Sequence, residues 1–116
     1  MPFVFTNTKI QGLCVITPRL FPDERGIFME TYKESDFINA GITERFVQDN
    51  HSRSSKGTLR GLHFQRSTSA QAKLMRCTCG RLWSVALDLR TNSSTYKQWH
   101  GVELSEKNRV MFFIPA

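Results

Sequence analysis

Apolar and polar residues alternate along most of the chain in short segments that turn residues separate. Alternation with a period of two is typical of strands that bury one face. It predicts strands at residues 9–16, 27–33, 46–52, 58–65, 71–78, 81–89, 96–104 and 109–114. The pattern therefore favours an all-β fold, an antiparallel sandwich or barrel.

A single segment, residues 35–40, is the good helical candidate, with Ser35 as its N-cap and Gly41 closing its end. One or two turns do not form alone, so tertiary contacts must hold this helix. Farther along, Gly80 separates two strands and predicts a hairpin between 71–78 and 81–89.

The segment 110–114 (VMFFI) is strongly apolar and predicts a central strand, yet the sequence stops two residues later. Because termini tend to be exposed, this ending indicates either a longer protein cut at this point or a partner subunit that covers the edge. We expect residues 1–116 to form one domain that is incomplete at its C-terminal side.

Composition excludes several classes of protein. With 116 residues, 40% hydrophobic and 22% charged, the chain fits one globular domain. It has no apolar run long enough to span a membrane, and its start (MPFVFTNTK) lacks the pattern of a secretory signal, so we expect a cytoplasmic protein without a membrane partner.

Its formal charge of +6 is scattered rather than clustered, which disfavours nucleic acid and is compatible with a diphosphate pocket. Cys14, Cys77 and Cys79 are odd in number and lack a second ligand pair, so we expect reduced thiols and no metal site.

Polar residues occupy strand positions that a buried face normally keeps apolar. In the predicted strand 46–52, Gln48 and Asn50 share one face, and Asp49 and His51 share the other. Hydrogen bonds to turns and to backbone groups would also explain why Gln48 and Asn50 are polar.

The next two predicted strands carry ionisable groups. Arg60 and His63 are three residues apart and would point to opposite sides of a regular strand, but an irregularity at Gly61 would turn both to one side. Lys73 opens the following strand. If these strands are neighbours, one cavity is lined by Gln48, Asn50, Arg60, His63 and Lys73.

Such a set is suited to one kind of chemistry, although His63 alone would more often be structural and Lys73 alone a surface charge. Imidazole exchanges protons near neutral pH, an ammonium group stabilises an enolate oxygen, and a guanidinium binds phosphate. The combination indicates proton abstraction beside a carbonyl on a phosphorylated substrate. No Ser or Cys nucleophile with a clear partner, His-x-His metal motif or Gly-rich phosphate loop is present.

Several motifs, in order, resemble the dTDP-4-dehydrorhamnose 3,5-epimerase family. They are FPDERGIFMETY (21–32), FVQDNHSRSSKGTLRGLHFQ (46–65), AQAKLMRCTCG (70–80), ALDLR (86–90) and WHGVELSEKN (99–108). The resemblance implies a cupin-type jelly roll, usually dimeric, that uses no metal or organic cofactor and acts on a dTDP-linked 4-keto sugar.

The resemblance also implies a role for each site residue. His63 would remove the protons at C5 and C3, Lys73 would lie beside the developing C4 oxyanion, and Arg60 would hold the diphosphate. Contacts to substrate are implied for Gln48, Asp49 and Asn50, and for Arg25 and Glu30, often across the dimer. Without the resemblance, Arg25 and Glu30 would be interpreted as an ordinary surface ion pair.

The chain also departs from the family's pattern. Ser84 stands where the family often has Asp, and Ile27 replaces a frequent aromatic residue. The family's second substrate-contacting His, its proton-donating Tyr and the acid that orients the base belong to strands beyond IP at 114–115. The sequence therefore leaves three hypotheses: a truncated epimerase, a non-catalytic cupin remnant that binds a nucleotide sugar, or a related cupin ketoisomerase.

Overall fold

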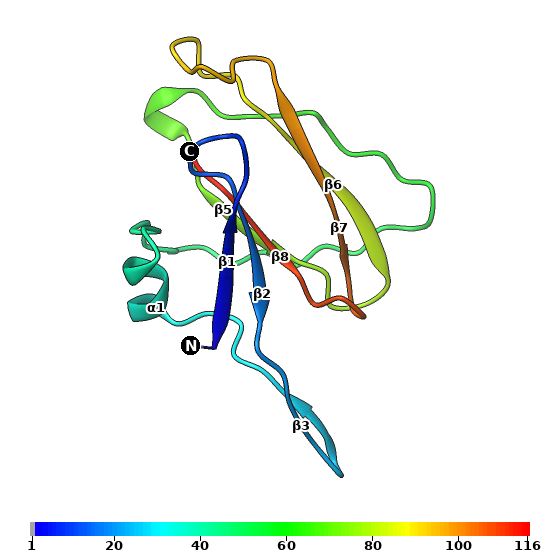
Figure 1. Ribbon diagram of the computed structural model, residues 1–116. Helices are drawn as coiled ribbons and strands as arrows, with labels where there is room; N and C mark the ends of the chain where they lie inside the picture. The colour runs from blue at the N-terminus through cyan, green and yellow to red at the C-terminus, as the bar shows by residue number, and fades with distance from the viewer. Residues whose placement is uncertain (1) are drawn as a thin grey trace.

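The computed structural model of the chain describes residues 2–116 as strands with two short helices (Figure 1). In chain order the elements are β1 (Phe3–Asn7), β2 (Cys14–Pro18), β3 (Phe21–Asp23), β4 (Gly26–Phe28), α1 (Glu34–Asn39), the 3-10 helix η1 (Ser67–Ser69), β5 (Lys73–Arg76), β6 (Arg81–Leu87), β7 (Trp99–Ser105) and β8 (Met111–Ile114). Every strand pair is antiparallel, as expected. Within the described residues, no helix is long and apolar enough to cross a membrane.

The strands form three sheets. Four strands pair in the order β1-β2-β8-β5, while β3–β4 and β6–β7 are separate two-stranded ladders. Figure 1 shows α1 on one side of the four-stranded sheet and β6–β7 on its other side. The apolar segment at 110–114 gives β8, which lies between β2 and β5, so its predicted central position is confirmed.

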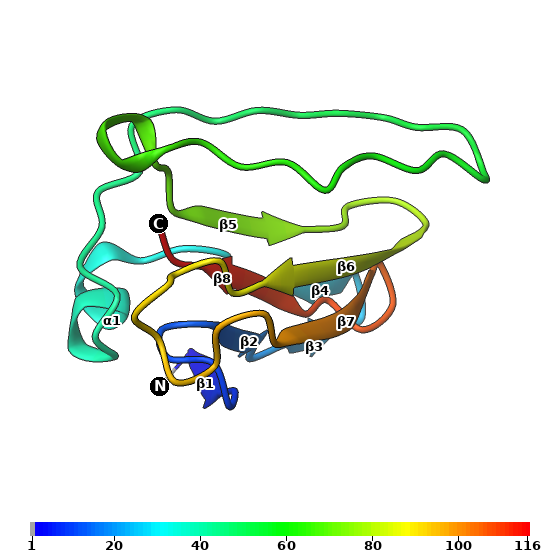
Figure 2. The same ribbon diagram turned by 90° about the horizontal axis from the view of Figure 1, so that it is seen from above.

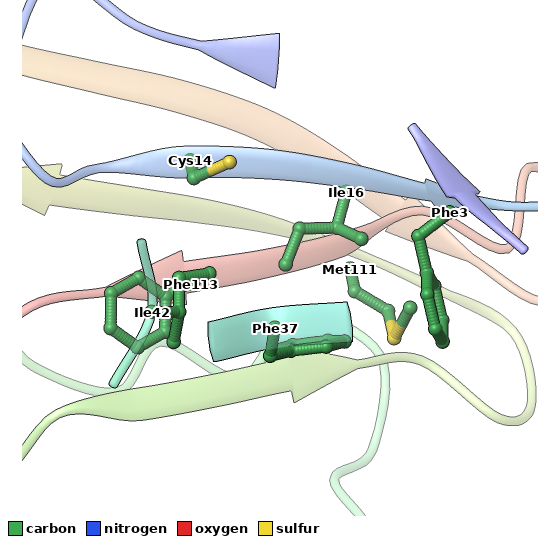
Figure 3. Packing of buried hydrophobic residues seen from close by; sticks show 7 residues of the cluster. All are labelled: Phe3, Cys14, Ile16, Phe37, Ile42, Met111 and Phe113. Atoms are coloured by element: carbon green, nitrogen blue, oxygen red, sulfur yellow. The ribbon is translucent and has the colours of Figure 1, made fainter. Parts of the chain in front are cut away.

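β8 is buried on both faces because each face packs against a different layer. Met111 and Phe113 point toward α1, where they meet Phe37 in a cluster that Figure 3 shows from close by. Phe112, which lies between them in sequence, packs in a second cluster with Leu104 of β7. Alternation along one strand therefore supplies both cores.

The helix is confirmed, although its start was predicted one residue late. α1 begins at Glu34, and Lys33 is its N-cap without a side-chain hydrogen bond, so Ser35 does not cap it. Gly41 adopts φ 93° and closes the C-terminal end, as expected. Phe37 holds the helix on the sheet through an edge-to-face contact with Phe3, with ring centroids 5.2 Å apart.

Several predicted strand bounds were wrong. The strand expected at 9–16 covers only 14–18, because residues 9–13 form the turn between β1 and β2. β1 itself was not predicted. The strand expected at 27–33 ends at Phe28, and that expected at 96–104 begins at Trp99.

The strands predicted at 46–52 and 58–65 are absent, and residues 43–66 instead form one long loop. Figure 2 shows this long loop beyond the β5 edge of the four-stranded sheet. Extended segments become strands only when a ladder pairs their backbone groups. The structure gives this loop no such partner, so apolar side chains such as Val47 and Leu59 are about nine-tenths exposed, at 87% and 91%.

The predicted hairpin around Gly80 was also wrong. β5 pairs with β8, whereas β6 pairs with β7, so the turn at Gly80 passes from one layer of the sandwich to the other. Burial explains this outcome: Met75 of β5 and Ala86 of β6 both pack in the second cluster between the layers, which a flat hairpin would not bury.

Candidate functional site

Lys73 lies at the start of β5, at one end of the four-stranded sheet. It pairs with Ile114 of β8. Met75 and Cys77 pack in the cluster between the layers, and side chains two residues apart share a strand face. Lys73 therefore projects from the face of β5 that looks toward β6 and β7, and its side chain remains exposed.

The layer opposite this face of β5 comes from β6 and β7. Ser84 pairs with Val102, and Ala86 pairs with His100, on the face that carries the second cluster. The His100 ring lies over Phe112, with ring centroids 6.2 Å apart. His100 was not among the predicted site residues, although its alternation with Val102 and Leu104 on the buried face was a signal for it.

The long loop carries the largest group of predicted site residues. Gln48 Nε2 donates a hydrogen bond to Asn50 Oδ1 at 3.3 Å, so these two side chains lie side by side, although the strand whose face they were expected to share is absent. Asp49 is exposed between them. On the returning arm, Arg60 Nε donates to Ser54 Oγ at 3.0 Å, which ties this arm to the tip of the loop.

His63 lies on the same returning arm, with its ring against Gly61. A β-carbon placed on Gly61 would be 3.3 Å from His63 Nδ1, and Gly61 has φ 104°, a conformation that disfavours any other residue. The backbone is thus unusual at Gly61, as expected, but the strand that it was expected to disrupt is absent, and the shared side of Arg60 and His63 stays a prediction. The glycine allows the imidazole to approach the backbone closely.

Arg25 and Glu30 belong to the β3–β4 hairpin and the segment after it. The Arg25 guanidinium binds Asp23, with Nη2 and Oδ2 2.7 Å apart, and this hydrogen bonding lowers the pKa of the Asp23 carboxyl. Arg25 is therefore paired with Asp23 and not with Glu30, which corrects the surface-pair reading.

Glu30 has a different environment from Arg25. Its Oε2 atom is buried without a hydrogen-bond partner. The side chain lines a cavity of about 410 Å³ together with Arg19, Lys33 and the rings of Phe21 and Phe28. An unpaired buried carboxylate oxygen costs free energy, so this position is suited to a hydrogen-bond donor from a ligand.

The predicted site residues thus occupy three places: the long loop, the start of β5, and the β3–β4 hairpin. Within residues 2–116, no hydrogen bond or ion pair joins one place to another, and the cavity that Glu30 lines includes neither His63 nor Lys73. The single cavity shared by Gln48, Asn50, Arg60, His63 and Lys73 stays a prediction. The described residues also include no group of three His, Cys, Asp or Glu side chains placed to hold a metal ion.

Comparison with known proteins gives one consistent family. The family profile described as dTDP-4-dehydrorhamnose 3,5-epimerase matches residues 7–116. The dTDP-4-dehydrorhamnose 3,5-epimerase of Methanothermobacter thermautotrophicus is 52% identical over 113 residues, which are 97% of this chain and 60% of that protein.

Solved structures agree with the sequence comparison. The crystal structure of dTDP-4-dehydrorhamnose 3,5-epimerase from Elizabethkingia anophelis has a TM-score of 0.94 at 46% identity, over 99% of this chain and 63% of that one. The Legionella pneumophila dTDP-6-deoxy-D-glucose-3,5-epimerase, in complex with dTDP-4-keto-L-rhamnose, has a TM-score of 0.92 at 46% identity, over 97% and 60%.

These likenesses confirm the expected cupin-type, antiparallel β fold. The chain spans about 60% of the length of its curated relatives from Methanothermobacter thermautotrophicus and Escherichia coli. With a family profile that matches nearly all of its residues, the chain belongs to the dTDP-4-dehydrorhamnose 3,5-epimerase family.

Proposed function

We propose that this chain carries the proton-abstracting part of an epimerase that acts on a dTDP-4-keto-6-deoxy sugar at C3 and C5. The observation that carries the proposal is the complex of the Legionella relative with dTDP-4-keto-L-rhamnose, in a structure that matches this chain with a TM-score of 0.92. The placement of Lys73 on the face of β5 that looks toward β6 and β7, with its side chain exposed, supports the same conclusion.

The chemistry starts at the C4 ketone, which makes the protons on C3 and C5 acidic. His63 accepts each proton because imidazole is a base near neutral pH. Negative charge then moves onto the C4 oxygen, where the Lys73 ammonium stabilises it. Return of a proton to the opposite face inverts the carbon centre.

The remaining predicted residues bind the nucleotide part of the substrate. Arg60 holds the diphosphate, since a guanidinium presents several donors to phosphate oxygens. Gln48, Asp49 and Asn50 contact the substrate from the other arm of the long loop. The β3–β4 hairpin extends away from the four-stranded sheet (Figure 1), and we propose that its Arg25 and the following Glu30 reach the substrate of a partner protomer in a homodimer.

The proposed setting is the cytoplasm, where nucleotide sugars serve deoxysugar and dTDP-rhamnose biosynthesis. Cys14, Cys77 and Cys79 are all free thiols, which is compatible with a reducing compartment.

The test is proton exchange in heavy water with dTDP-4-keto-6-deoxyglucose, read by NMR at C3 and C5. Exchange with inversion would support the full proposal. Exchange without inversion would support His63 as the base and would mean that the group that returns a proton to the opposite face of the sugar is not among these residues. Binding of the nucleotide without any exchange would overturn the catalytic proposal and favour a nucleotide-sugar binding module. A product rearranged rather than epimerised would favour the ketoisomerase.

A matched pair of histidine variants isolates the base. His63→Ala should abolish exchange at both carbons and leave dTDP binding nearly intact. His51→Ala removes an imidazole that is also exposed in the same loop, and it should leave exchange unchanged. Retained exchange in His63→Ala would remove His63 from its assigned role.

A further inference from the structure

A second cavity, of about 540 Å³, lies where the β5–β6 turn meets the β7–β8 turn. We call it the turn cavity. Its volume falls within the range of small-molecule sites, roughly 300–1,000 Å³. It is lined by Met29, Arg76, Cys77, Thr78, Glu106, Lys107 and Arg109.

The two turns that form the turn cavity are fixed to each other and within themselves. The backbone N–H of Glu106 donates to the Gly80 carbonyl at 3.0 Å, which joins the turns. Asn108 Oδ1 accepts hydrogen bonds from the N–H groups of Ser105 and Val110, both at 3.0 Å. Its Nδ2 donates to the Glu103 carbonyl at 2.9 Å. These hydrogen bonds therefore fix the backbone of the β7–β8 turn, which carries Lys107 and Arg109 on either side of Asn108.

The lining of the turn cavity carries more positive than negative charge. Three of the lining side chains are cationic, Arg76, Lys107 and Arg109, and one is anionic, Glu106. No ion pair found among residues 2–116 includes any of these four side chains. Arg109 Nη1 donates to the Lys107 carbonyl at 2.9 Å, which restrains its guanidinium beside Lys107.

The charge arrangement favours an anion. Like charges that converge in a concave surface repel one another and attract a counter-ion, and a doubly charged phosphate relieves the repulsion best. The Thr78 hydroxyl adds a neutral donor, and Met29 adds an apolar wall beside the charged groups. The cavity volume that a single phosphate leaves free is large enough for the rest of a small phosphorylated molecule.

The turn cavity is separate from the proposed catalytic groups. Lys73 and Arg76 are three residues apart on β5, which is roughly 10 Å along a strand. None of His63, Lys73 and Arg60 lines the turn cavity. We propose that the turn cavity is a second anion site, which binds the phosphate group of a phosphorylated small molecule through Arg76, Lys107 and Arg109.

The experiment measures binding of radiolabelled orthophosphate to the 116-residue chain by equilibrium dialysis at constant ionic strength. Lys107→Gln and Arg109→Gln together should weaken binding by at least about tenfold, since each loses a charge-assisted contact. The matched control, Lys9→Gln with Arg66→Gln, removes one lysine and one arginine from exposed positions elsewhere and should retain the original affinity.

Three results would overturn the proposal. Equal weakening in both double variants would mean general attraction to net positive charge. Binding that never saturates would mean a diffuse counter-ion atmosphere. A loss of dTDP affinity in the Lys107 and Arg109 variant, equal to its loss of phosphate affinity, would make the turn cavity part of the nucleotide site. A single saturable site sensitive to that variant alone would support a second anion site, whether or not exchange at C3 and C5 is observed.

Discussion

The carboxylate of Asp88 offers the sharpest test of what holds the two layers of this fold together. Its side chain is fully buried, and it accepts hydrogen bonds from Arg90 Nε at 3.0 Å and from the hydroxyls of Ser93 and Thr95 at 2.6 Å each. Arg90 Nη2 also donates to the Gln11 carbonyl at 3.0 Å. The network therefore fastens the β6–β7 connection to the β1–β2 turn.

Asp88→Asn removes the charge while keeping the shape of the side chain. Breaking one partner of a buried ion pair costs about 3–5 kcal/mol, and we expect the lower end, about 3 kcal/mol, because Arg90 is partly exposed and can be solvated. The measurement is urea denaturation, in which the midpoint should fall with an unchanged slope. The control is Asp23→Asn, which breaks the exposed ion pair with Arg25 and should have little effect.

The pH dependence gives an independent check. Hydrogen bonds from Arg90, and secondarily from Ser93 and Thr95, lower the pKa of Asp88 well below its usual value of 3.8. A group with a lowered folded-state pKa contributes stability that is complete above the unfolded value and is lost as pH falls toward the folded value. The original chain should thus lose stability below about pH 4, and Asp88→Asn should lose less over that interval. Equal midpoint shifts in the Asp88 and Asp23 variants, or parallel pH profiles with and without Asp88, would refute this account.

Three further outcomes are expected. Lys73→Met should lower the rate of proton exchange far more than it weakens dTDP binding, because in the proposed mechanism Lys73 acts on charge that appears only during the reaction. Equal losses in kinetics and in a binding titration would indicate ground-state binding instead. Phe112→Ala should destabilise the chain by about 4 kcal/mol in chemical denaturation, since this fully buried ring belongs to the cluster between the layers, and a loss below about 1 kcal/mol would contradict that packing. In sedimentation, the 116-residue chain should associate, because Val47 and Leu59 are exposed on a loop without strand partners, whereas a monomer at all concentrations would contradict this expectation.

The candidate site residues were chosen from local sequence, by motifs that resemble those of the family, and their assembly into one cavity stays a prediction. Gln48 and Asn50 were expected on one face and are hydrogen-bonded to each other. Gly61 was expected to disrupt its segment and has a positive φ. Two features were not predicted. One is the inward position of His100 against Phe112, and the other is the buried Oε2 of Glu30, in a cavity that is lined mainly by residues 19–33.

What the sequence by itself determined is local: the two faces of β8, the helix that closes at Gly41, and the all-β class. Alternation is a relation between residues i and i+2, so it fixes which side chains share a face but not which strands pair. The tertiary structure alone decided that β5 pairs with β8 and not with β6, and that residues 43–66 form a loop. The physical reason is that a ladder forms only where both backbone partners are present and both faces find a layer to bury them, and these conditions depend on contacts between distant parts of the chain.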